Sequence, residues 1–144
     1  MDLMIAIAES CTGGLVSAAL TEIPGSSAVL DRGFVTYSYP SKTELLGVSP
    51  DILAQFGAVS EEAASQMAKG AIEASNAQVA VSITGVAGPG GSNNKPEGLV
   101  FFGLSSLQTK QIIIKKEFGA IGRSNVRLKS VETALNMLLR AVDA

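Results

Sequence analysis

The sequence predicts an α/β protein, a three-layer α-β-α architecture in which a mixed sheet has helices on both faces. Short apolar runs alternate with amphipathic runs in the first half of the chain, as they do in parallel β-α units. Two apolar runs follow each other directly in the second half, which is typical of an antiparallel pair. No linker, repeat or low-complexity segment divides residues 1–144, so we expect a single domain.

The first half of the chain contains the alternating segments. Glycine and proline set most of their ends, since Pro24-Gly25 should stop a helix and Pro40 should end a strand. Ser60 is a typical N-cap for the helix that follows it. The expected strands span residues 3–8, 34–39 and 78–84, and the expected helices span residues 12–23, 41–46, 50–56 and 60–75.

The second half begins with a glycine-rich loop over residues 85–98. The apolar runs at residues 99–105 and 111–118 are expected to pair as antiparallel strands. Residues 123–142 should form the closing helix, because apolar residues recur there at helical spacing. Its expected core side consists of Val126, Val131, Leu135, Leu138 and Leu139.

Composition limits the function classes. Apolar residues make up 47% of the chain and the mean hydropathy is +0.32. The apolar runs are nevertheless far shorter than the roughly 18 residues of a membrane-spanning helix, and Met1-Asp2 starts no basic signal region. A single cysteine excludes an internal disulfide. We therefore expect a cytoplasmic protein without a membrane partner.

Charge and the absence of histidine exclude further classes. The net charge is −2 and the basic residues are spread thinly, so nucleic acid is not an expected partner. No histidine is present, which removes histidine-based triads and ordinary zinc sites. We expect no metal and no cofactor. Any catalysis must then depend on Ser, Thr, Tyr, Lys, Cys or carboxylate side chains.

The segment Glu9-Ser10-Cys11-Thr12-Gly13-Gly14 lies where the first strand gives way to the first helix. Such a turn presents its residues at the carboxyl edge of the sheet, beside the free N–H groups of the helix. Two hydroxyls, a thiol and two glycines at this edge predict a nucleophile next to an anion or oxyanion site. The alternative is a capped helix start, with Thr12 as the N-cap.

A second segment, Thr36-Tyr37 with Lys42, spans the predicted end of a strand and the start of a helix. Its tyrosine and lysine can converge on one point. Because the helix dipole disfavours a cation in the first turn, we expect a lowered pKa for Lys42, as an amine base requires. The alternative is that Tyr37 is a core residue and Lys42 a solvated surface lysine.

The third segment is the glycine-rich loop. Its candidate residues are Thr84, Gly85, Gly88, Pro89, Gly90 and Gly91, with Lys95 behind them. Glycines after a buried strand let backbone N–H groups approach a ligand closely. The loop lacks the end of a Walker A motif and the spacing of a dinucleotide fingerprint. The alternative is a flexible surface loop, although long loops in small domains are usually functional.

These segments resemble motifs of the CinA C-terminal domain family. The similar stretches are residues 9–14, 24–27, 35–38 with Lys42 and 46–48, 57–61, and 84–91 with Lys95-Pro96. They occur in order over essentially the whole chain. The resemblance implies a stand-alone nicotinamide-nucleotide amidohydrolase, which converts the small-molecule nucleotide substrate nicotinamide mononucleotide to nicotinate mononucleotide and ammonia without a metal.

The resemblance also implies a catalytic set of Ser10, Tyr37 and Lys42. Ser10 would be the nucleophile and neutral Lys42 its base, while Tyr37 would relay the proton and help deliver it to departing ammonia. Backbone N–H groups of residues 11–14 would stabilise the oxyanion. The expected substrate-binding residues are Glu9, Cys11, Thr12, Gly13, Gly14, Thr36, Thr84, Gly85, Gly88, Pro89, Gly90, Gly91, Lys95 and Arg123.

The chain departs from the family pattern at Tyr39-Pro40, where Asn and an acidic residue are frequent, and at Glu97, where an apolar residue is usual. Tyr39 would stand on the same strand face as Tyr37 and compete for its role. Glu97 would change the charge of the loop near the substrate.

Two other function classes compete with the amidohydrolase. A Ser-Tyr-Lys reductase needs a Tyr-x-x-x-Lys spacing, and neither Tyr37 nor Tyr39 stands at that distance from Lys42. A non-catalytic nucleotide-binding or interaction module would keep the loop without turnover, although all three proposed catalytic residues are present. In either case, a chain this small and apolar is expected to bury surface in a homo-oligomer.

Overall fold

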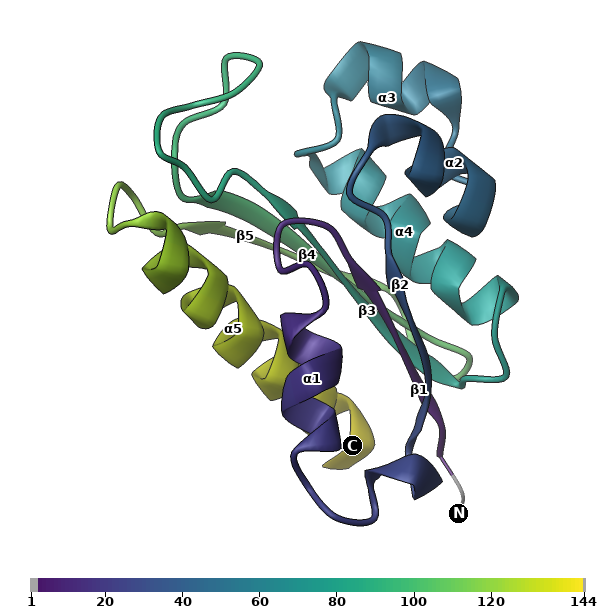
Figure 1. Cartoon of the computed structure of the whole chain (residues 1–144). Helices are drawn as coiled ribbons and strands as arrows, with labels where there is room; N and C mark the ends of the chain where they lie inside the picture. Colours follow the sequence, from purple (N-terminus) through teal and green to yellow (C-terminus); the bar gives the residue numbers. More distant parts are fainter. Residues whose placement is uncertain (1–2, 144) are drawn as a thin grey trace.

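The computed structural model describes residues 3–143, which form a five-stranded sheet between two layers of helices (Figure 1). Residues 1, 2 and 144 lie outside the described part, and so does the Met1-Asp2 start used in the expectation about a signal region. The strands are β1 (Ile5–Glu9), β2 (Leu30–Val35), β3 (Val79–Gly85), β4 (Leu99–Ser106) and β5 (Ile112–Glu117). The helices are α1 (Leu15–Thr21), the 3-10 turn η1 (Ser26–Ala28), α2 (Tyr39–Leu46), α3 (Pro50–Phe56), α4 (Glu61–Glu73) and α5 (Arg123–Asp143).

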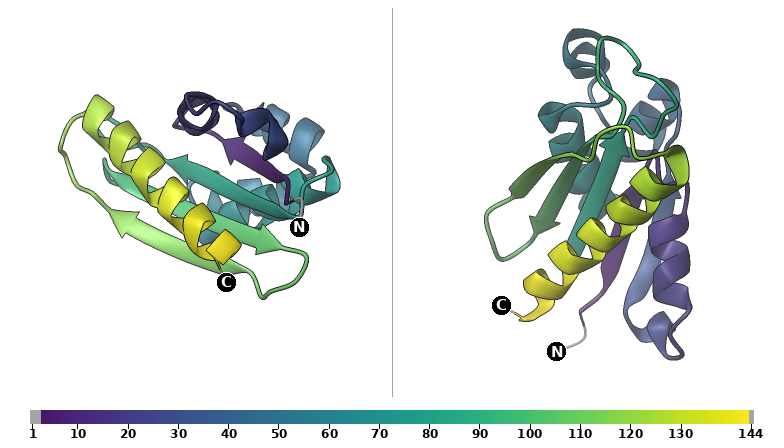
Figure 2. Two further views of the ribbon diagram at one scale, coloured as in Figure 1. Left: turned by 90° about the horizontal axis from the view of Figure 1, so that it is seen from below. Right: turned by 90° about the vertical axis from the view of Figure 1, so that its left-hand side faces the viewer.

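The sheet is mixed, with the strand order β2-β1-β3-β4-β5. β1 pairs in parallel with β2 and β3, while β4 pairs antiparallel with β3 and β5. Helices α1 and α5 cover one face, and α2, α3 and α4 lie on the other (Figure 1; Figure 2). The predicted three-layer α/β fold, parallel early and antiparallel late, is confirmed.

The core is divided by β1, whose five residues are all buried. Because the pleat sends alternate side chains to opposite faces, Ile5 and Ile7 join the core on the α5 side, and Ala6 and Ala8 the core on the α4 side. Small residues let α4 approach the sheet closely. A Cβ on Gly103 of β4, for example, would lie only 2.6 Å from a backbone oxygen of α4.

The second strand lies earlier than the sequence predicts. β2 ends at Val35, and Tyr39 and Pro40 form the first turn of α2. Ser38 caps this helix by accepting the N–H of Ser41 at 3.2 Å. Proline is tolerated in a first turn because its missing N–H would have no helical partner. The expectation that Pro40 ends a strand is therefore wrong, and so is the expectation that Tyr39 lies on the same strand face as Tyr37.

The closing helix α5 lies within one residue of its predicted range. Leu139 is 56% exposed, however, so its expected place in the core is wrong. Ala134 and Met137 occupy the core side instead. Within residues 3–143, none of the helices has the length and apolar content that crossing a bilayer requires.

Gly70 allows α4 to contact α2, and we expect alanine at this position to destabilise the protein. A Cβ would overlap the backbone oxygen of Leu46 at the end of α2. Alanine gains about 1 kcal/mol over glycine inside a helix, but overpacking costs roughly 1–3 kcal/mol, and more against rigid backbone. Urea denaturation should therefore give a lower midpoint for Gly70→Ala. Lys69→Ala on the exposed face of α4 is the control, and its midpoint should stay near that of the unaltered protein. Equal midpoints for Gly70→Ala and Lys69→Ala would contradict the prediction.

Candidate active site

Ser10 follows β1 at the carboxyl edge of the parallel part of the sheet. Its N–H donates to the backbone oxygen of Ile83 at 3.0 Å, which fixes it beside β3. Thr36, which follows β2, donates its N–H to the backbone oxygen of Glu9 at 2.8 Å. The ends of three strands are thus held together. Ser10 lies at this junction with only 7% of its surface exposed.

Lys42 reaches the same junction from α2, and its side chain is completely buried. Nζ lies 2.9 Å from Ser10 Oγ, 2.6 Å from the backbone oxygen of Thr36 and 3.3 Å from that of Tyr37. These three oxygens match the three donors of an ammonium group. When the amine is neutral, its lone pair can accept the proton of Ser10. The geometry therefore places the candidate nucleophile against the candidate base.

Burial lowers the pKa of Lys42 from its ordinary value of 10.5 to about 8. Among the described residues, no carboxylate forms a salt bridge with Lys42 that would restore the charged form. The direction agrees with the sequence prediction, but its main cause is removal from water and not the helix dipole. A usable fraction of the amine is neutral near physiological pH.

Glu9 is a fully buried carboxylate that caps α1. Oε1 accepts the N–H groups of Gly14 at 3.1 Å and Val16 at 3.0 Å. Oε2 accepts the N–H and the hydroxyl of Ser17 at 3.0 and 2.7 Å. The expected N-cap at Thr12 is wrong, since Gly14 occupies the cap position with φ +108°. The anion site predicted at this helix start is already filled by the Glu9 carboxylate, so the N–H groups of Gly14, Val16 and Ser17 are not available to a substrate.

The turn between Ser10 and α1 offers two remaining oxyanion donors. Gly13 N–H donates to the backbone oxygen of Ser10 at 3.0 Å, so this group is occupied, as is that of Gly14. The N–H groups of Cys11 and Thr12 make no hydrogen bond to another residue within the described part of the chain. The oxyanion donors expected over residues 11–14 therefore reduce to these two.

Arg127 of α5 holds this turn from the other side. Its Nε and Nη2 donate to the backbone oxygens of Cys11 at 3.2 Å and Thr12 at 3.3 Å. Sequence reasoning missed this residue. The available signal was its position one turn after Arg123 at the start of the closing helix. With both carbonyl groups bound by one guanidinium, the peptide planes that carry the candidate donors are fixed.

The thiol of Cys11 is buried next to Ser10. Burial raises its pKa from 9.0 to about 11, so the thiol stays protonated at neutral pH. A nucleophilic cysteine requires a thiolate. Of the two adjacent candidates, only Ser10 also contacts a base.

A cavity of about 180 Å³, here called the inner cavity, opens above Ser10 and Lys42. Its lining includes six of the predicted site residues besides Lys42, namely Ser10, Cys11, Tyr37, Thr84, Gly85 and Arg123. Its other lining residues are Tyr39, Ala58, Val59, Ala87, Ser92 and Asn93. The charged residues of this lining are Lys42 and Arg123. Arg123 can therefore bind an anionic group of a ligand.

Tyr37 and Arg123 form the exposed mouth of the inner cavity. The guanidinium of Arg123 donates to the Tyr37 hydroxyl at 3.2 Å and to the backbone oxygen of Gly88 through a second nitrogen. Tyr37 is 61% exposed, and its hydroxyl makes no hydrogen bond to Ser10 or Lys42. The structure thus joins Tyr37 to the catalytic pair through its backbone oxygen, which accepts from Lys42.

Several predicted substrate-binding residues lie away from the inner cavity lining. Thr36 is fully buried and acts through its backbone oxygen on Lys42. Gly90 N–H donates to the carboxylate of Glu97, so this loop donor is occupied by the chain itself. The other residues outside the lining are Glu9, Thr12, Gly13, Gly14, Gly88, Pro89, Gly91 and Lys95.

Tyr39 and Asn93 are the contacts that sequence reasoning assigned to no binding role. Both line the inner cavity, and Asn93 Nδ2 lies 3.4 Å from the Tyr39 hydroxyl. They are 54 positions apart, so no local pattern links them. Among the described residues, no group of three Cys, Asp or Glu side chains is arranged to hold a metal ion.

Known sequences match nearly the entire chain. A model described as the CinA C-terminal domain matches residues 1–142. The nicotinamide-nucleotide amidohydrolase PncC of Enterobacter agglomerans is 50% identical over 137 residues, covering 94% of this chain and 83% of that protein. A putative competence-damage inducible protein of Moorella thermoacetica is 44% identical over 143 residues, covering 99% of this chain. The chain spans only 34% of that longer relative.

Solved structures show the same fold. The competence/damage inducible protein CihA of Agrobacterium tumefaciens has 51% identity and a TM-score of 0.94, with 96% of this chain and 85% of that chain covered. The CinA superfamily protein ECK1530/EC0983 of Escherichia coli has 35% identity and a TM-score of 0.92, with 97% and 81% covered. On the family match and these similarities, the chain belongs to the CinA C-terminal domain family.

Proposed function

We propose that this chain is an amidohydrolase that converts nicotinamide mononucleotide to nicotinate mononucleotide and ammonia. The observation that carries the proposal is the buried contact of 2.9 Å between Lys42 Nζ and Ser10 Oγ. A serine paired with an amine of lowered pKa is suited to acyl transfer. Its relative PncC is named for hydrolysis of a nicotinamide nucleotide, which supplies the substrate class.

The reaction begins when neutral Lys42 removes the proton of Ser10 as Oγ attacks the carboxamide carbon. The tetrahedral intermediate places its negative oxygen against the free N–H groups of Cys11 and Thr12. The carbon–nitrogen bond then breaks and the leaving nitrogen takes the proton from the lysine ammonium, giving ammonia and an ester on Ser10. Neutral Lys42 then deprotonates a water molecule, which attacks the ester carbon, and the resulting lysine ammonium returns its proton to Oγ as the ester bond breaks. The released carboxylic acid ionises to the carboxylate, and ammonia takes up its proton.

Tyr37 and Arg123 complete the proposed site at its mouth. Arg123 is the cation available to the phosphate, since Lys42 is enclosed behind Ser10. The Tyr37 hydroxyl, bound to Arg123, lines the inner cavity, so it can relay the proton of the lysine ammonium to the leaving nitrogen. The Thr84 hydroxyl donates to the backbone oxygen of Ala58 at 2.7 Å, and Thr84 forms part of the wall of the inner cavity.

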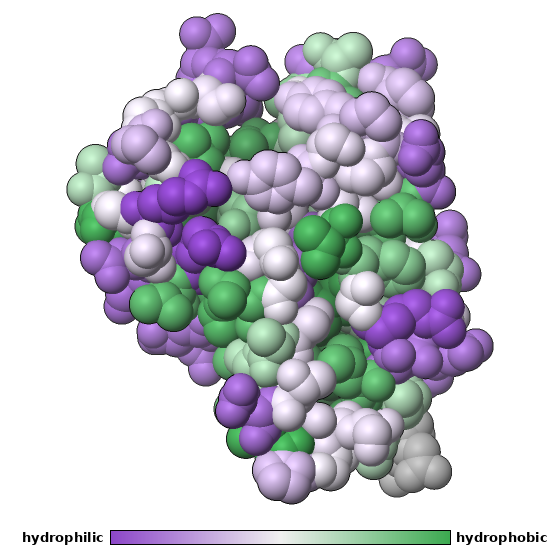
Figure 3. Space-filling view, in the orientation of Figure 1, coloured by the Kyte–Doolittle hydropathy of each residue, from purple (hydrophilic) through white to green (hydrophobic). Residues whose placement is uncertain are grey.

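A cytoplasmic location and self-association remain predictions about the setting of this enzyme. Apolar side chains gather near α1 and β2 in the space-filling view (Figure 3), where Ile23, Val29 and Val35 are exposed. Large exposed apolar side chains are a common feature of subunit interfaces. We therefore keep a homo-oligomer as the proposed state.

Purified protein incubated with nicotinamide mononucleotide should release ammonia and form nicotinate mononucleotide in equal amounts. Because the proposed acid–base chemistry uses only protein side chains, excess chelator should leave the rate unchanged. Coupled detection of ammonia, together with chromatography of the nucleotides, measures both products. No release of ammonia, or release that stops with chelator and returns with a divalent ion, would contradict the proposal.

Replacement of the nucleophile should separate Ser10 from its neighbour Cys11. Ser10→Ala should abolish turnover while the protein stays folded and still binds the nucleotide, because only the attacking oxygen is lost. Cys11→Ala should keep much of the activity, since the buried thiol is protonated and has no base. Steady-state rates and melting temperatures of both variants test this assignment. An active Ser10→Ala beside a folded but inactive Cys11→Ala would reverse it.

The base hypothesis predicts a rate that rises with pH. Since the pKa of Lys42 is lowered to about 8, the neutral, reactive amine increases as pH rises through that value and is lost below it. Lys42→Arg supplies a guanidinium that stays protonated, so we expect its turnover to fall about as far as in Lys42→Ala. The pH profile of kcat/KM is the measurement. Substantial activity in the arginine variant would show that Lys42 only binds the substrate.

A further inference from the structure

A second, larger hollow adjoins the inner cavity. This outer groove encloses about 760 Å³ between the loop after β3 and the helical layer of α3 and α4, and a hollow at this place is visible between loop and helices in Figure 3. The two spaces share five lining residues, which are Tyr39, Ala58, Val59, Ser92 and Asn93. The two spaces therefore meet along one border, which these five residues form.

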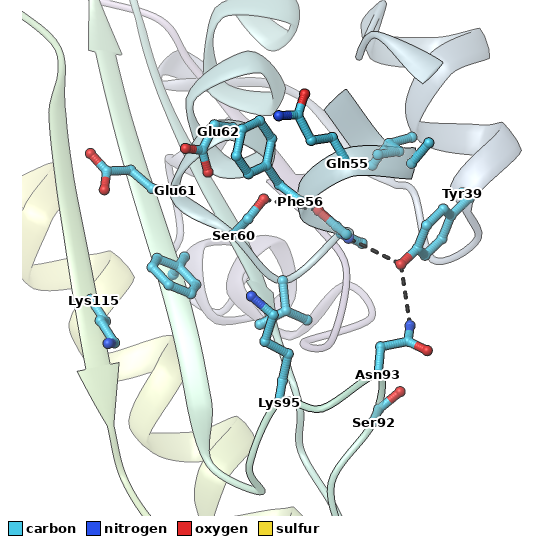
Figure 4. A pocket seen from close by; sticks show the side chains of 16 residues that line it. Tyr39, Gln55, Phe56, Ser60, Glu61, Glu62, Ser92, Asn93, Lys95 and Lys115 are labelled. Carbon is cyan, nitrogen blue, oxygen red and sulfur yellow. Dashed lines mark hydrogen bonds between the residues drawn. The ribbon is translucent and has the colours of Figure 1, made fainter. Parts of the chain in front are cut away.

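Tyr39 closes this border. Its hydroxyl accepts the N–H of Ala58 at 3.1 Å and lies 3.4 Å from Asn93 Nδ2, as the dashed lines of Figure 4 show. The first contact anchors the ring to the segment before α4. The second is the side-chain hydrogen bond that ties residues 91–95 to the helical layer. We call this pair of side chains, Tyr39 and Asn93, the partition.

The outer groove has the chemistry of a nucleotide subsite. Its lining includes the half-buried ring of Phe56, on which a base can stack, and the buried ring of Phe101. It also includes the ammonium groups of Lys95 and Lys115, which can bind phosphate oxygens. Two carboxylates, Glu61 and Glu62, line the same groove and can accept hydrogen bonds from sugar hydroxyls. Lys95 rises from the loop toward the start of α4 in Figure 4. Lys95 was expected at the catalytic cavity, but it lines this neighbouring space instead.

We propose that the partition is a specificity determinant that limits the length of the ligand; this inference rests on the proposed function. The inner cavity of about 180 Å³ is smaller than the roughly 300 Å³ of a typical small-molecule pocket. It holds the nicotinamide ring, while the ribose phosphate extends through the open mouth toward Arg123. A dinucleotide with the same carboxamide carries a second nucleotide, and the space suited to it lies behind Tyr39.

Removal of the Tyr39 ring should connect the two spaces. The proposal then predicts a change in the ratio of kcat/KM for nicotinamide adenine dinucleotide to kcat/KM for nicotinamide mononucleotide. Tyr39→Ala should raise this ratio about tenfold or more, a common size for selectivity set by a pocket wall. Asn93→Ala should raise it less, because the ring stays in place but loses its tie to the loop.

Asn94→Ala is the matched control for Asn93→Ala. Both asparagines are exposed and adopt left-handed backbone conformations, with φ of +48° for Asn93 and +63° for Asn94. Alanine strains both positions alike, but only Asn93 contacts Tyr39. The ratio should therefore be unchanged in Asn94→Ala. Equal ratios for the two variants would overturn the role of Asn93.

Calorimetric binding of the dinucleotide gives a second readout that does not depend on turnover. Tyr39→Ala should bind it more tightly than the unaltered protein does, and an unchanged ratio together with unchanged binding would overturn the partition. If Tyr39→Ala does not fold, Asn93→Ala decides the outcome by the same two measurements. If the unaltered protein releases no ammonia from the mononucleotide, the proposed function fails, and the binding comparison still tests the partition.

Discussion

The site depends on one costly arrangement, a completely buried lysine that has no carboxylate partner among residues 3–143. An ammonium group in such a place loses its hydration, and only oxygen acceptors within reach can replace it. Lys42 finds three, two on the backbone after β2 and one on Ser10 after β1. They offset the cost only in part, which is why its pKa falls to about 8. The same burial that destabilises the charged form supplies the free amine that the proposed reaction needs.

A second buried ionisable side chain, Glu9, precedes Ser10 in the chain and has different partners. Glu9 receives four donors from the start of α1 and forms no ion pair with Lys42 among the described residues. All four donors are N–H groups and a hydroxyl at the start of this helix, where acidic side chains are commonly bound. Glu9 therefore fixes the turn that carries Ser10, whereas Lys42 stays free to change its protonation state. Of these two buried ionisable groups, Glu9 thus holds the backbone in place and Lys42 supplies the proposed reactivity.

Apolar periodicity was sufficient to predict the mixed sheet and its two helical layers, because burial of strand and helix faces is a local pattern. The β2–α2 boundary was missed because a capping serine and a first-turn proline resemble a strand end. Ser10 and Lys42 were identified through a motif, yet the burial of Lys42 was not, since lysine is almost always exposed. The contact between Tyr39 and Asn93 joins residues far apart in sequence, so it could be found only from the three-dimensional structure.

The topology places the proposed catalytic pair and the proposed specificity determinant on different parts of the fold. Parallel strands bring the residues after β1 and β2 to one edge, where hydrogen bonds between their ends hold Ser10 against Lys42. The antiparallel return of β4 makes the intervening loop reach over the same edge. Helix α5 begins there too. Arg123 therefore donates to Gly88 in the loop, and Arg127 donates to Cys11 in the turn after Ser10. Because the proposed catalytic pair rests on the sheet and the partition partly on the loop, our proposal implies that changes in the loop alter the accepted ligand size without moving Ser10.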